Sequence, residues 1–173
     1  MNIEIERKFL VRSDDWQKFA TDCYQIRQAY LDTNPKVSIR VRIRDNATAT
    51  LTVKSSSSSL RRLELEYPIP VLEAEALMPL RNSAVVEKTR HIVPCSALAS
   101  GGLVWEVDEF SGANAGLVIA EIELPSEQHA IELPAWIGQE VTGQKQYYNG
   151  SLAMHPFSQW GQPDHRVRAE TSR

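Results

Sequence analysis

Cysteine is scarce in this sequence of 173 residues, which contains only Cys23 and Cys95. Two thiols cannot build the multiple disulfides that staple small secreted proteins. No secretory signal precedes the first predicted strand. We therefore expect a cytoplasmic protein in which both cysteines are reduced, buried and chemically inert.

Long apolar runs and an excess of basic charge are also missing. No stretch approaches the ~20 apolar residues of a membrane-spanning helix, and the net charge is -3. A general nucleic-acid binder usually carries a basic excess. No serine or cysteine lies in a recognisable nucleophile motif, and the histidines show no metal-ligand spacing. These absences argue against a membrane protein, a nucleic-acid binder and a histidine metal site.

What the sequence does contain is a series of strand-like stretches separated by turn signals. DTNPK, RDNAT and SGANAG provide such turns, and the run of serines at 55–59 indicates a loop. The predicted strands are 2–11, 23–32, 36–44, 48–54, 60–69, 84–93, 102–109 and 116–124.

Three amphipathic segments interrupt the strands and are predicted to be helices: SDDWQKFATDC, VLEAEALMPL and GQKQYYNGSLAMH. Ser13 is the expected N-cap of the first, and Pro156 ends the third. After Trp160 the chain has no apolar periodicity. We predict one domain over residues 1–160 and a disordered tail over 161–173.

Charged residues occupy every second position in most of the predicted strands. A period of two places such residues on one face of a strand and the intervening apolar residues on the other. Across seven strands this face carries basic and acidic residues in equal number. The basic residues are Lys8, Arg40, Arg42, Arg44, Lys54, Arg62, Lys88 and Arg90, and the acidic residues are Glu4, Glu6, Glu64, Glu66, Glu106, Asp108, Glu121 and Glu123.

A solvated face of an antiparallel sheet is the commonest cause of such alternation, and it explains any single strand. It explains the set less well, because these strands place few uncharged polar residues there. Arg40, Arg42 and Arg44 also form a row without an acid, which repels itself unless an anion neutralises it. Carboxylate clusters suit hard cations such as Mg²⁺ or Mn²⁺. Together, arginines and a carboxylate-held metal are suited to binding a polyphosphate.

Eight strands are enough to close into a barrel. The charged face could point outward around an apolar interior, or it could line a tunnel whose apolar outer face is covered by helices. Three amphipathic helices offer such a cover, so we favour the tunnel. The predicted fold class is α+β, mainly β: an eight-stranded antiparallel closed β-barrel with a charged lumen and flanking helices.

These segments resemble the CYTH superfamily, the triphosphate tunnel metalloenzymes. EIERKFLV is similar to the E-x-E-x-K signature of that family, and IRVRIR, LTVKS, RLELEYPI, EKTRH, VWEVDEF, AEIELP and VTGQKQYYNGSLA follow in the family's order. The resemblance extends over almost the whole chain. It implies an antiparallel eight-stranded tunnel that binds triphosphate together with a divalent metal, Mg²⁺ or Mn²⁺.

The resemblance also implies roles for individual residues. The residues expected to bind phosphate oxygens are Lys8, Arg40, Arg42, Lys54, Lys88 and Arg90, with Lys145 reaching in from the C-terminal segment. The residues expected to hold the metal are Glu121, Glu123 and Asp108. Glu4 and Glu6 would orient a second metal or the attacking water, and with Lys8 they form the expected catalytic group. Tunnel residues without a defined role are Glu64, Glu66, Arg44, Arg62, Glu106 and Tyr30.

The expected function is hydrolysis of inorganic triphosphate to diphosphate and phosphate by a metal-dependent triphosphatase. The alternatives are a class IV adenylate cyclase, a thiamine triphosphatase, and a non-catalytic polyphosphate-binding module. A cyclase would need a pocket for adenine and ribose, and no additional segment is available to build one. The expected partner is a small-molecule triphosphate, without nucleic acid or membrane, and a homodimer is left open.

Overall fold

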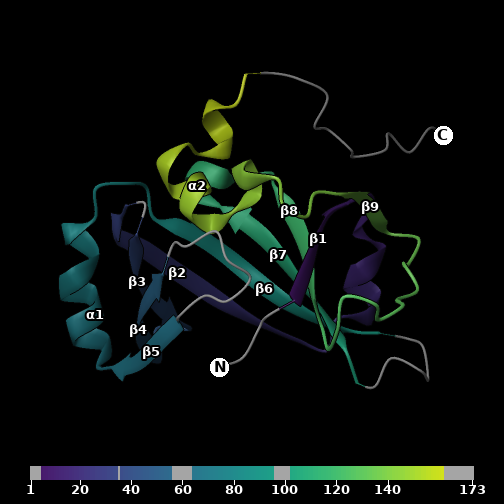
Figure 1. Ribbon diagram of the computed structural model, residues 1–173, viewed down its shortest axis with the longest axis horizontal. Coiled ribbons are helices and arrows are strands. Elements are labelled where there is room, and N and C mark those ends of the chain that lie inside the picture. The colour runs from purple at the N-terminus through teal and green to yellow at the C-terminus, as the bar shows by residue number, and fades with distance from the viewer. Residues whose placement is uncertain (1–4, 35, 56–63, 96–101, 162–173) are drawn as a thin grey trace.

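The computed structural model describes residues 5–34, 36–55, 64–95 and 102–161 (Figure 1). Its strands are β1 (Ile5–Val11), β2 (Asp22–Thr33), β3 (Val37–Arg44), β4 (Thr48–Ser55), β5 (Glu64–Ile69), β6 (Val86–Pro94), β7 (Val104–Ser111), β8 (Val118–Leu124) and β9 (Ile137–Glu140). The α-helices are α1 (Val71–Leu77) and α2 (Asn149–Met154). Short 3₁₀ turns are η1 (Asp14–Phe19), η2 (Met78–Leu80), η4 (Gly112–Asn114), η5 (Lys145–Tyr147) and η6 (Phe157–Gln159).

The strands form one antiparallel sheet in the order β5-β4-β3-β2-β6-β7-β8-β1-β9. The mainly β, antiparallel prediction is confirmed. The prediction of eight strands closed into a barrel is wrong: among the strands described, β5 and β9 are unpaired edges of a nine-stranded sheet. The reason is the unexpected β9, which pairs with the free side of β1 and so takes the place where a closing strand would bind.

The eight predicted strands are all present, with changes at their ends. Residues 1–4 and 56–63 lie outside the described ranges, as do residues 162–173 of the predicted tail. β8 begins at Val118 because the chain first makes the 3₁₀ turn η4, after which Phe110 N donates to Leu117 O. β9 escaped prediction because four residues are too few to show an alternating pattern.

Two of the predicted helices are shorter than expected. The segment after Ser13 forms only the 3₁₀ turn η1, in which the Ser13 side chain accepts a hydrogen bond from Asp15 N. The segment 143–155 is divided into η5 and α2 because Tyr148 between them has an extended backbone. No helix in the described part of the chain is long and apolar enough to cross a membrane.

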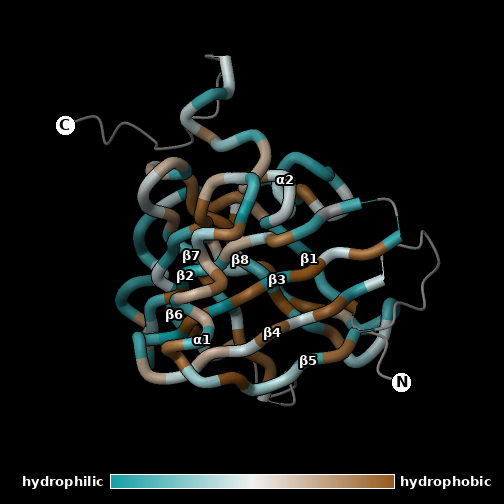
Figure 2. Tube along the Cα trace, turned by 90° about the vertical axis from the view of Figure 1, so that its left-hand side faces the viewer, coloured by the Kyte–Doolittle hydropathy of each residue, from teal (hydrophilic) through white to brown (hydrophobic). Residues whose placement is uncertain are grey.

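The alternating pattern gives the sheet one apolar and one charged face, and Figure 2 shows brown and teal segments following one another along the strands. Val41 and Ile43 of β3 are buried on the apolar face, in a cluster with Ala74 of α1 and Met78 of η2. On the same face, Trp16 of η1 packs with Trp105 and other core residues. Two of the three predicted amphipathic segments, which form η1 and α1, therefore cover the outer face of the sheet as the sequence predicted, but the third does not.

The C-terminal segment has a different place. Leu152 and Ala153 of α2 pack against Tyr30, Val86 and Phe110 of the sheet. Figure 1 shows α2 at the top of the view, apart from α1 at the left. This segment therefore covers one end of the charged, concave face.

Cys23 and Cys95 are not joined by a disulfide, and the prediction that both are buried is wrong. Cys23 is exposed near the start of β2, and Cys95 is half-buried at the end of β6.

Candidate active site

The concave face of the sheet encloses a cavity of about 1090 Å³. Residues of strands β1 to β8 and of α2 form its walls. The predicted site residues that line this cavity are Glu6, Lys8, Tyr30, Arg40, Arg42, Lys54, Glu64, Glu66, Arg90, Glu106, Glu121 and Glu123. Strand parity alone had placed the charged members of this set on one face, and the structure brings them around one space.

The remaining predicted site residues lie elsewhere. Lys88 and Asp108 are buried within the wall and are not part of the cavity lining. Arg44 lines a smaller, adjoining cavity. Lys145 is exposed on η5, outside the cavity lining. Glu4 and Arg62 lie outside the described residues.

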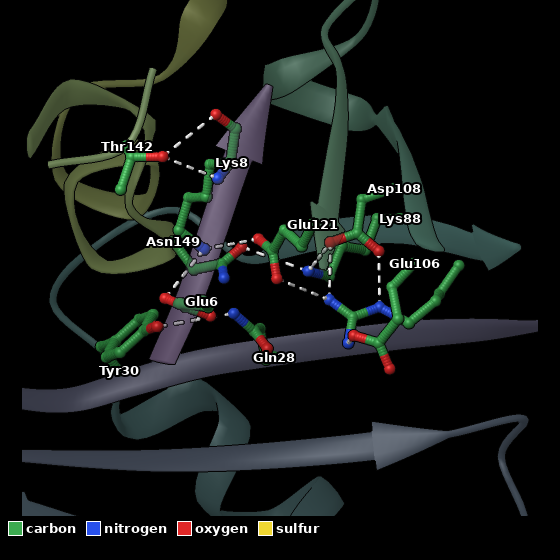
Figure 3. Close-up of polar contacts among 11 residues, drawn as sticks. Glu6, Lys8, Gln28, Tyr30, Lys88, Glu106, Asp108, Glu121, Thr142 and Asn149 are labelled. Atoms are coloured by element: carbon green, nitrogen blue, oxygen red, sulfur yellow. Dashed lines mark hydrogen bonds and ion pairs between the residues drawn. The ribbon is translucent and has the colours of Figure 1, made fainter. Parts of the chain in front are cut away.

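The register of β1, β8 and β7 places charges of both signs opposite one another. Glu121 of β8 lies opposite both Lys8 of β1 and Glu106 of β7, and Glu6 lies opposite Glu123. Lys8 Nζ is 2.7 Å from Glu121 Oε1 and 3.1 Å from Glu6 Oε1 (Figure 3). Burial lowers the pKa of Lys8, but the attraction of Glu121 and Glu6 outweighs it and the pKa is raised. Lys8 is therefore a cation at neutral pH although it is only 5% exposed.

A buried ion-pair network supports the other side of the cavity. Asp108 accepts from Lys88 Nζ at 2.5 Å and from Arg90 Nε and Nη2, each at 2.7 Å. Burial alone would raise the pKa of Asp108, but the two cations hold it below its usual range. Arg90 also pairs with Glu106 and, at 3.4 Å, with Glu121. These contacts hold its guanidinium at the cavity wall.

The surroundings of Lys88 act on its pKa in opposite directions. Burial lowers its pKa to about 8, aided by the nearby Arg90, although Asp108 acts in the other direction. Its ammonium group also donates to Asn149 Oδ1 at 3.3 Å. Lys88 therefore connects the sheet to the first residue of α2.

The two cavity-facing arginines of β3 lack close carboxylate partners among the residues that the structure describes. Arg40 Nη2 donates to Thr52 Oγ1 at 3.1 Å, and its distances to Glu64 and Glu66 are 3.9 and 3.7 Å. Its Nε is buried and has no hydrogen-bond partner within the described ranges. Such a group is poised to donate to a ligand that enters the cavity.

Arg42 is the less compensated of the two. Its Nε donates to the neutral Gln28 Oε1 at 3.1 Å. Burial, followed by repulsion from Arg40 and Arg90, lowers the pKa of Arg42. A buried guanidinium in this setting favours the binding of an anion, which would relieve the repulsion.

Glu64 and Glu66 of β5 lie close to basic and hydroxyl side chains of β3 and β4. Lys54 Nζ lies 2.7 Å from Glu64 Oε2, and Thr52 Oγ1 donates to Glu66 Oε2 at 3.2 Å. Burial would raise the pKa of Glu64, but Lys54 and Arg40 lower it. Both carboxylates thus position cationic side chains at this edge of the cavity, a role that the sequence had left open.

Several polar residues of the site escaped prediction. Gln28 and Thr52 are almost completely buried and contact Arg42 and Arg40. Their strand parity was the available signal, because each lies opposite the arginine that it contacts. Asn149 belongs to the third predicted helix, and its contact with Lys88 depends on how α2 folds back onto the sheet.

The carboxylates around the cavity suit a hard divalent cation in kind, because all of them offer oxygen donors. Glu121, Glu123, Glu6 and Glu106 all line it. Within the ranges that the structure describes, however, no three histidine, cysteine or acidic residues lie close enough together to hold a metal ion. In this arrangement Glu121 is instead paired with Lys8 and Arg90.

The antiparallel sheet with paired charges on its concave face is the architecture expected of a triphosphate-binding tunnel protein. The CYTH domain model matches residues 2–154, and the chain belongs to this family. It is 44% identical over 157 residues to an inorganic triphosphatase of Acetivibrio thermocellus, covering 91% of this chain and 97% of that protein. It is 38% identical over 154 residues to an inorganic triphosphatase of Nitrosomonas europaea, covering 87% and 97%.

A solved structure agrees with this family assignment. The crystal structure of the inorganic triphosphatase NE1496 superposes with a TM-score of 0.66 at 34% sequence identity. The match covers 89% of this chain and 96% of that one. The similarity therefore extends to nearly the whole fold.

Proposed function

We propose that this protein is a metal-dependent inorganic triphosphatase, which hydrolyses inorganic triphosphate to diphosphate and phosphate in the larger cavity. The observation that carries the proposal is the poorly compensated Arg40 and Arg42, which face Lys8 and Arg90 across one space. A compact polyanion satisfies all four cations at once. The two relatives named inorganic triphosphatase, at 44% and 38% identity, support this choice of polyanion.

The cavity-lining cations bind the phosphate oxygens. Arg40 and Arg42 grip them with charge-assisted hydrogen bonds, which are stronger than neutral ones. Lys8, Lys54 and Arg90 complete the ring of positive charge. Because the cavity walls hold these donors close together before the substrate arrives, they stabilise the charge that develops on the leaving diphosphate with little movement of the backbone.

Lys88 and Asp108 have a supporting role in this proposal. Both side chains are completely buried, and neither lines the cavity. Asp108 holds Arg90 through two hydrogen bonds, and Lys88 joins Asp108 to Asn149. We therefore propose that Asp108 positions Arg90 and that Lys88 positions α2. These roles replace the metal contact expected of Asp108 and the phosphate contact expected of Lys88.

Glu121 and Glu123 are the proposed ligands of a divalent cation, Mg²⁺ or Mn²⁺, with Glu6 and Glu106 nearby. Phosphate oxygens would give Lys8 and Arg90 new anionic partners, so that Glu121 becomes available to the cation. The bound cation supplies neutralisation of phosphate charge and polarisation of the phosphoryl group.

In the proposed reaction, a water oxygen bonds to a terminal phosphorus while the bridging P–O bond to the leaving diphosphate breaks. Glu6 lies at the cavity wall and is half exposed, so it can orient that water and accept its proton. Glu4, for which the same role was predicted, lies outside the described residues. Lys8 contacts Glu6 at 3.1 Å and lines the same cavity, where its ammonium group stabilises the negative charge that develops on the phosphoryl oxygens.

An organic triphosphate is the second candidate substrate. Leu103, Val104 and Pro125 give one part of the same cavity a small apolar wall, whereas the side chains of Ile122 and Leu124 belong to the core on the other face of β8. A flat ring of thiamine or a nucleoside could pack there while its phosphates reach the basic residues. This wall favours thiamine or nucleotide triphosphate hydrolysis as the alternative reading of the site.

Phosphate release measured with tripolyphosphate, ATP and thiamine triphosphate tests the choice. Each substrate is incubated with Mg²⁺, with Mn²⁺ and with a chelator, and the products are resolved by chromatography. We expect fast, metal-dependent cleavage of tripolyphosphate to diphosphate and phosphate. Faster turnover of ATP or thiamine triphosphate would favour the alternative, cyclic AMP as the main product would indicate a cyclase, and tight binding without turnover would indicate a binding module.

The remaining expectations are also proposals. We propose one domain over residues 1–160, a cytoplasmic location, and either a monomer or a homodimer in solution. Analytical ultracentrifugation decides the oligomeric state. Limited proteolysis, with the cleavage sites identified by mass spectrometry, tests whether the resistant fragment ends near residue 160.

A further inference from the structure

A second cavity of about 220 Å³ adjoins the larger one on the concave face. Arg42 and Glu66 line both cavities. The smaller one continues along β3 from Arg42 to Arg44, toward the turn that joins β3 to β4. The proposed hydrolysis needs only the larger cavity, so this second space is unexplained by it.

Arg44 is held in the smaller cavity in a way that leaves it available to a ligand. Its guanidinium carbon lies 3.6 Å from the centre of the Tyr24 ring, which fixes the group by its face. Its ion-pair contact with Asp45 is long, at 3.8 Å, and both side chains are about half exposed. A guanidinium stacked on a ring still presents its N–H donors at its edge.

Two hydroxyl groups complete a donor-rich wall. Thr48 lies opposite Arg44 in the β3–β4 register, and Thr50 lies opposite Arg42. All four side chains line the smaller cavity. Glu66 is the acidic residue of this lining, and its carboxylate already accepts from Thr52 and faces Arg40 at 3.7 Å.

We infer that the smaller cavity is a second oxyanion site, which binds inorganic orthophosphate between Arg44 and the hydroxyls of Thr48 and Thr50. Two guanidinium groups and two hydroxyls match the several acceptor oxygens of a phosphate ion. The inference does not need the larger cavity to be catalytic. If the proposed function is correct, this site lies where phosphate released from the larger cavity would be held.

Calorimetric titration of the protein with orthophosphate, and separately with tripolyphosphate, distinguishes the two sites. A chelator is present in each titration to remove divalent metal. Arg44→Gln and the double variant Thr48→Val/Thr50→Val should each bind orthophosphate about tenfold more weakly than the unaltered protein. Arg40→Gln should bind orthophosphate within about threefold of the unaltered protein but lose affinity for tripolyphosphate. The matched control is Arg12→Gln, which removes another exposed arginine away from both cavities.

Circular dichroism and thermal melts of each variant exclude loss of folding as the cause. The inference is overturned if the unaltered protein binds no orthophosphate at millimolar concentration. It is also overturned if Arg44→Gln and the double variant both bind like the unaltered protein, or if loss of orthophosphate binding follows Arg40 instead. Failure of the proposed function would appear separately, as absent turnover of tripolyphosphate with Mg²⁺ and Mn²⁺.

Discussion

Lys88 Nζ lies 2.5 Å from Asp108 Oδ2, and both side chains are completely buried. The same carboxylate accepts two hydrogen bonds from Arg90. One buried anion therefore serves two cations in the wall of the cavity. Figure 3 shows Lys88 and Asp108 pointing toward each other beside Glu121. We expect both the stability of the fold and the position of Arg90, a proposed phosphate-binding residue, to depend on the Asp108 carboxylate.

Asp108→Asn should destabilise the protein by about 3–5 kcal/mol, because it leaves the buried Lys88 without its carboxylate and weakens two hydrogen bonds from Arg90, which keeps Glu106 and Glu121. The measurement is urea unfolding followed by circular dichroism at neutral pH. Glu109→Gln is the matched control on the same strand, since Glu109 is exposed and its contact is with His91 at 3.6 Å. Equal losses in both variants would contradict the special role of Asp108.

The same pair predicts a pH dependence of stability. Lys88 and Arg90 hold the pKa of Asp108 below its usual range, so folding favours the ionised carboxylate. This contribution is present above the unfolded pKa of about 4 and is lost as pH falls through the lower native pKa. The stability difference between the unaltered protein and Asp108→Asn should therefore shrink as the pH is lowered below about 4. A difference that stays constant down to pH 2 would contradict this assignment.

Arg42→Gln should have opposite effects on the free protein and on ligand binding. The free protein should melt a few degrees higher, because removal of a poorly compensated buried charge relieves repulsion from Arg40 and Arg90. Tripolyphosphate should bind about tenfold or more weakly, because a charge-assisted hydrogen bond is lost. Thermal melts with and without tripolyphosphate measure both effects, with Arg12→Gln as control. Unchanged stabilisation by the ligand would refute a phosphate role for Arg42.

Glu123→Gln should raise the Mg²⁺ concentration needed for half-maximal tripolyphosphate cleavage by about tenfold or more, since one anionic ligand of a hard cation is lost. Its fold should be unaffected, because Glu123 is exposed at the cavity wall. The readout is the metal dependence of the initial rate. Glu73→Gln on the exposed side of α1 is the control. Identical metal curves for both variants would remove Glu123 from the metal site.

Local features of the sequence were sufficient to predict which residues face the cavity. Successive side chains of a strand point to opposite sides, so the parity of Arg40 and Arg42 in β3 follows from the chain itself. The same rule placed Lys8, Glu121 and Arg90 on the cavity side. It also put Lys88 and Asp108 on that side, but it could not show that they are sealed inside the wall.

The sequence by itself therefore determined every described strand except β9, the two faces of these strands and the supply of charge, because each depends on neighbours along the chain. Only the tertiary structure decided that Asp108 pairs with Lys88 and Arg90, since ion pairs between strands depend on register. It also decided that β9 takes the free side of β1 and leaves the sheet open. Edge pairing is a competition between distant segments for the same backbone hydrogen bonds, and no local pattern records which segment wins.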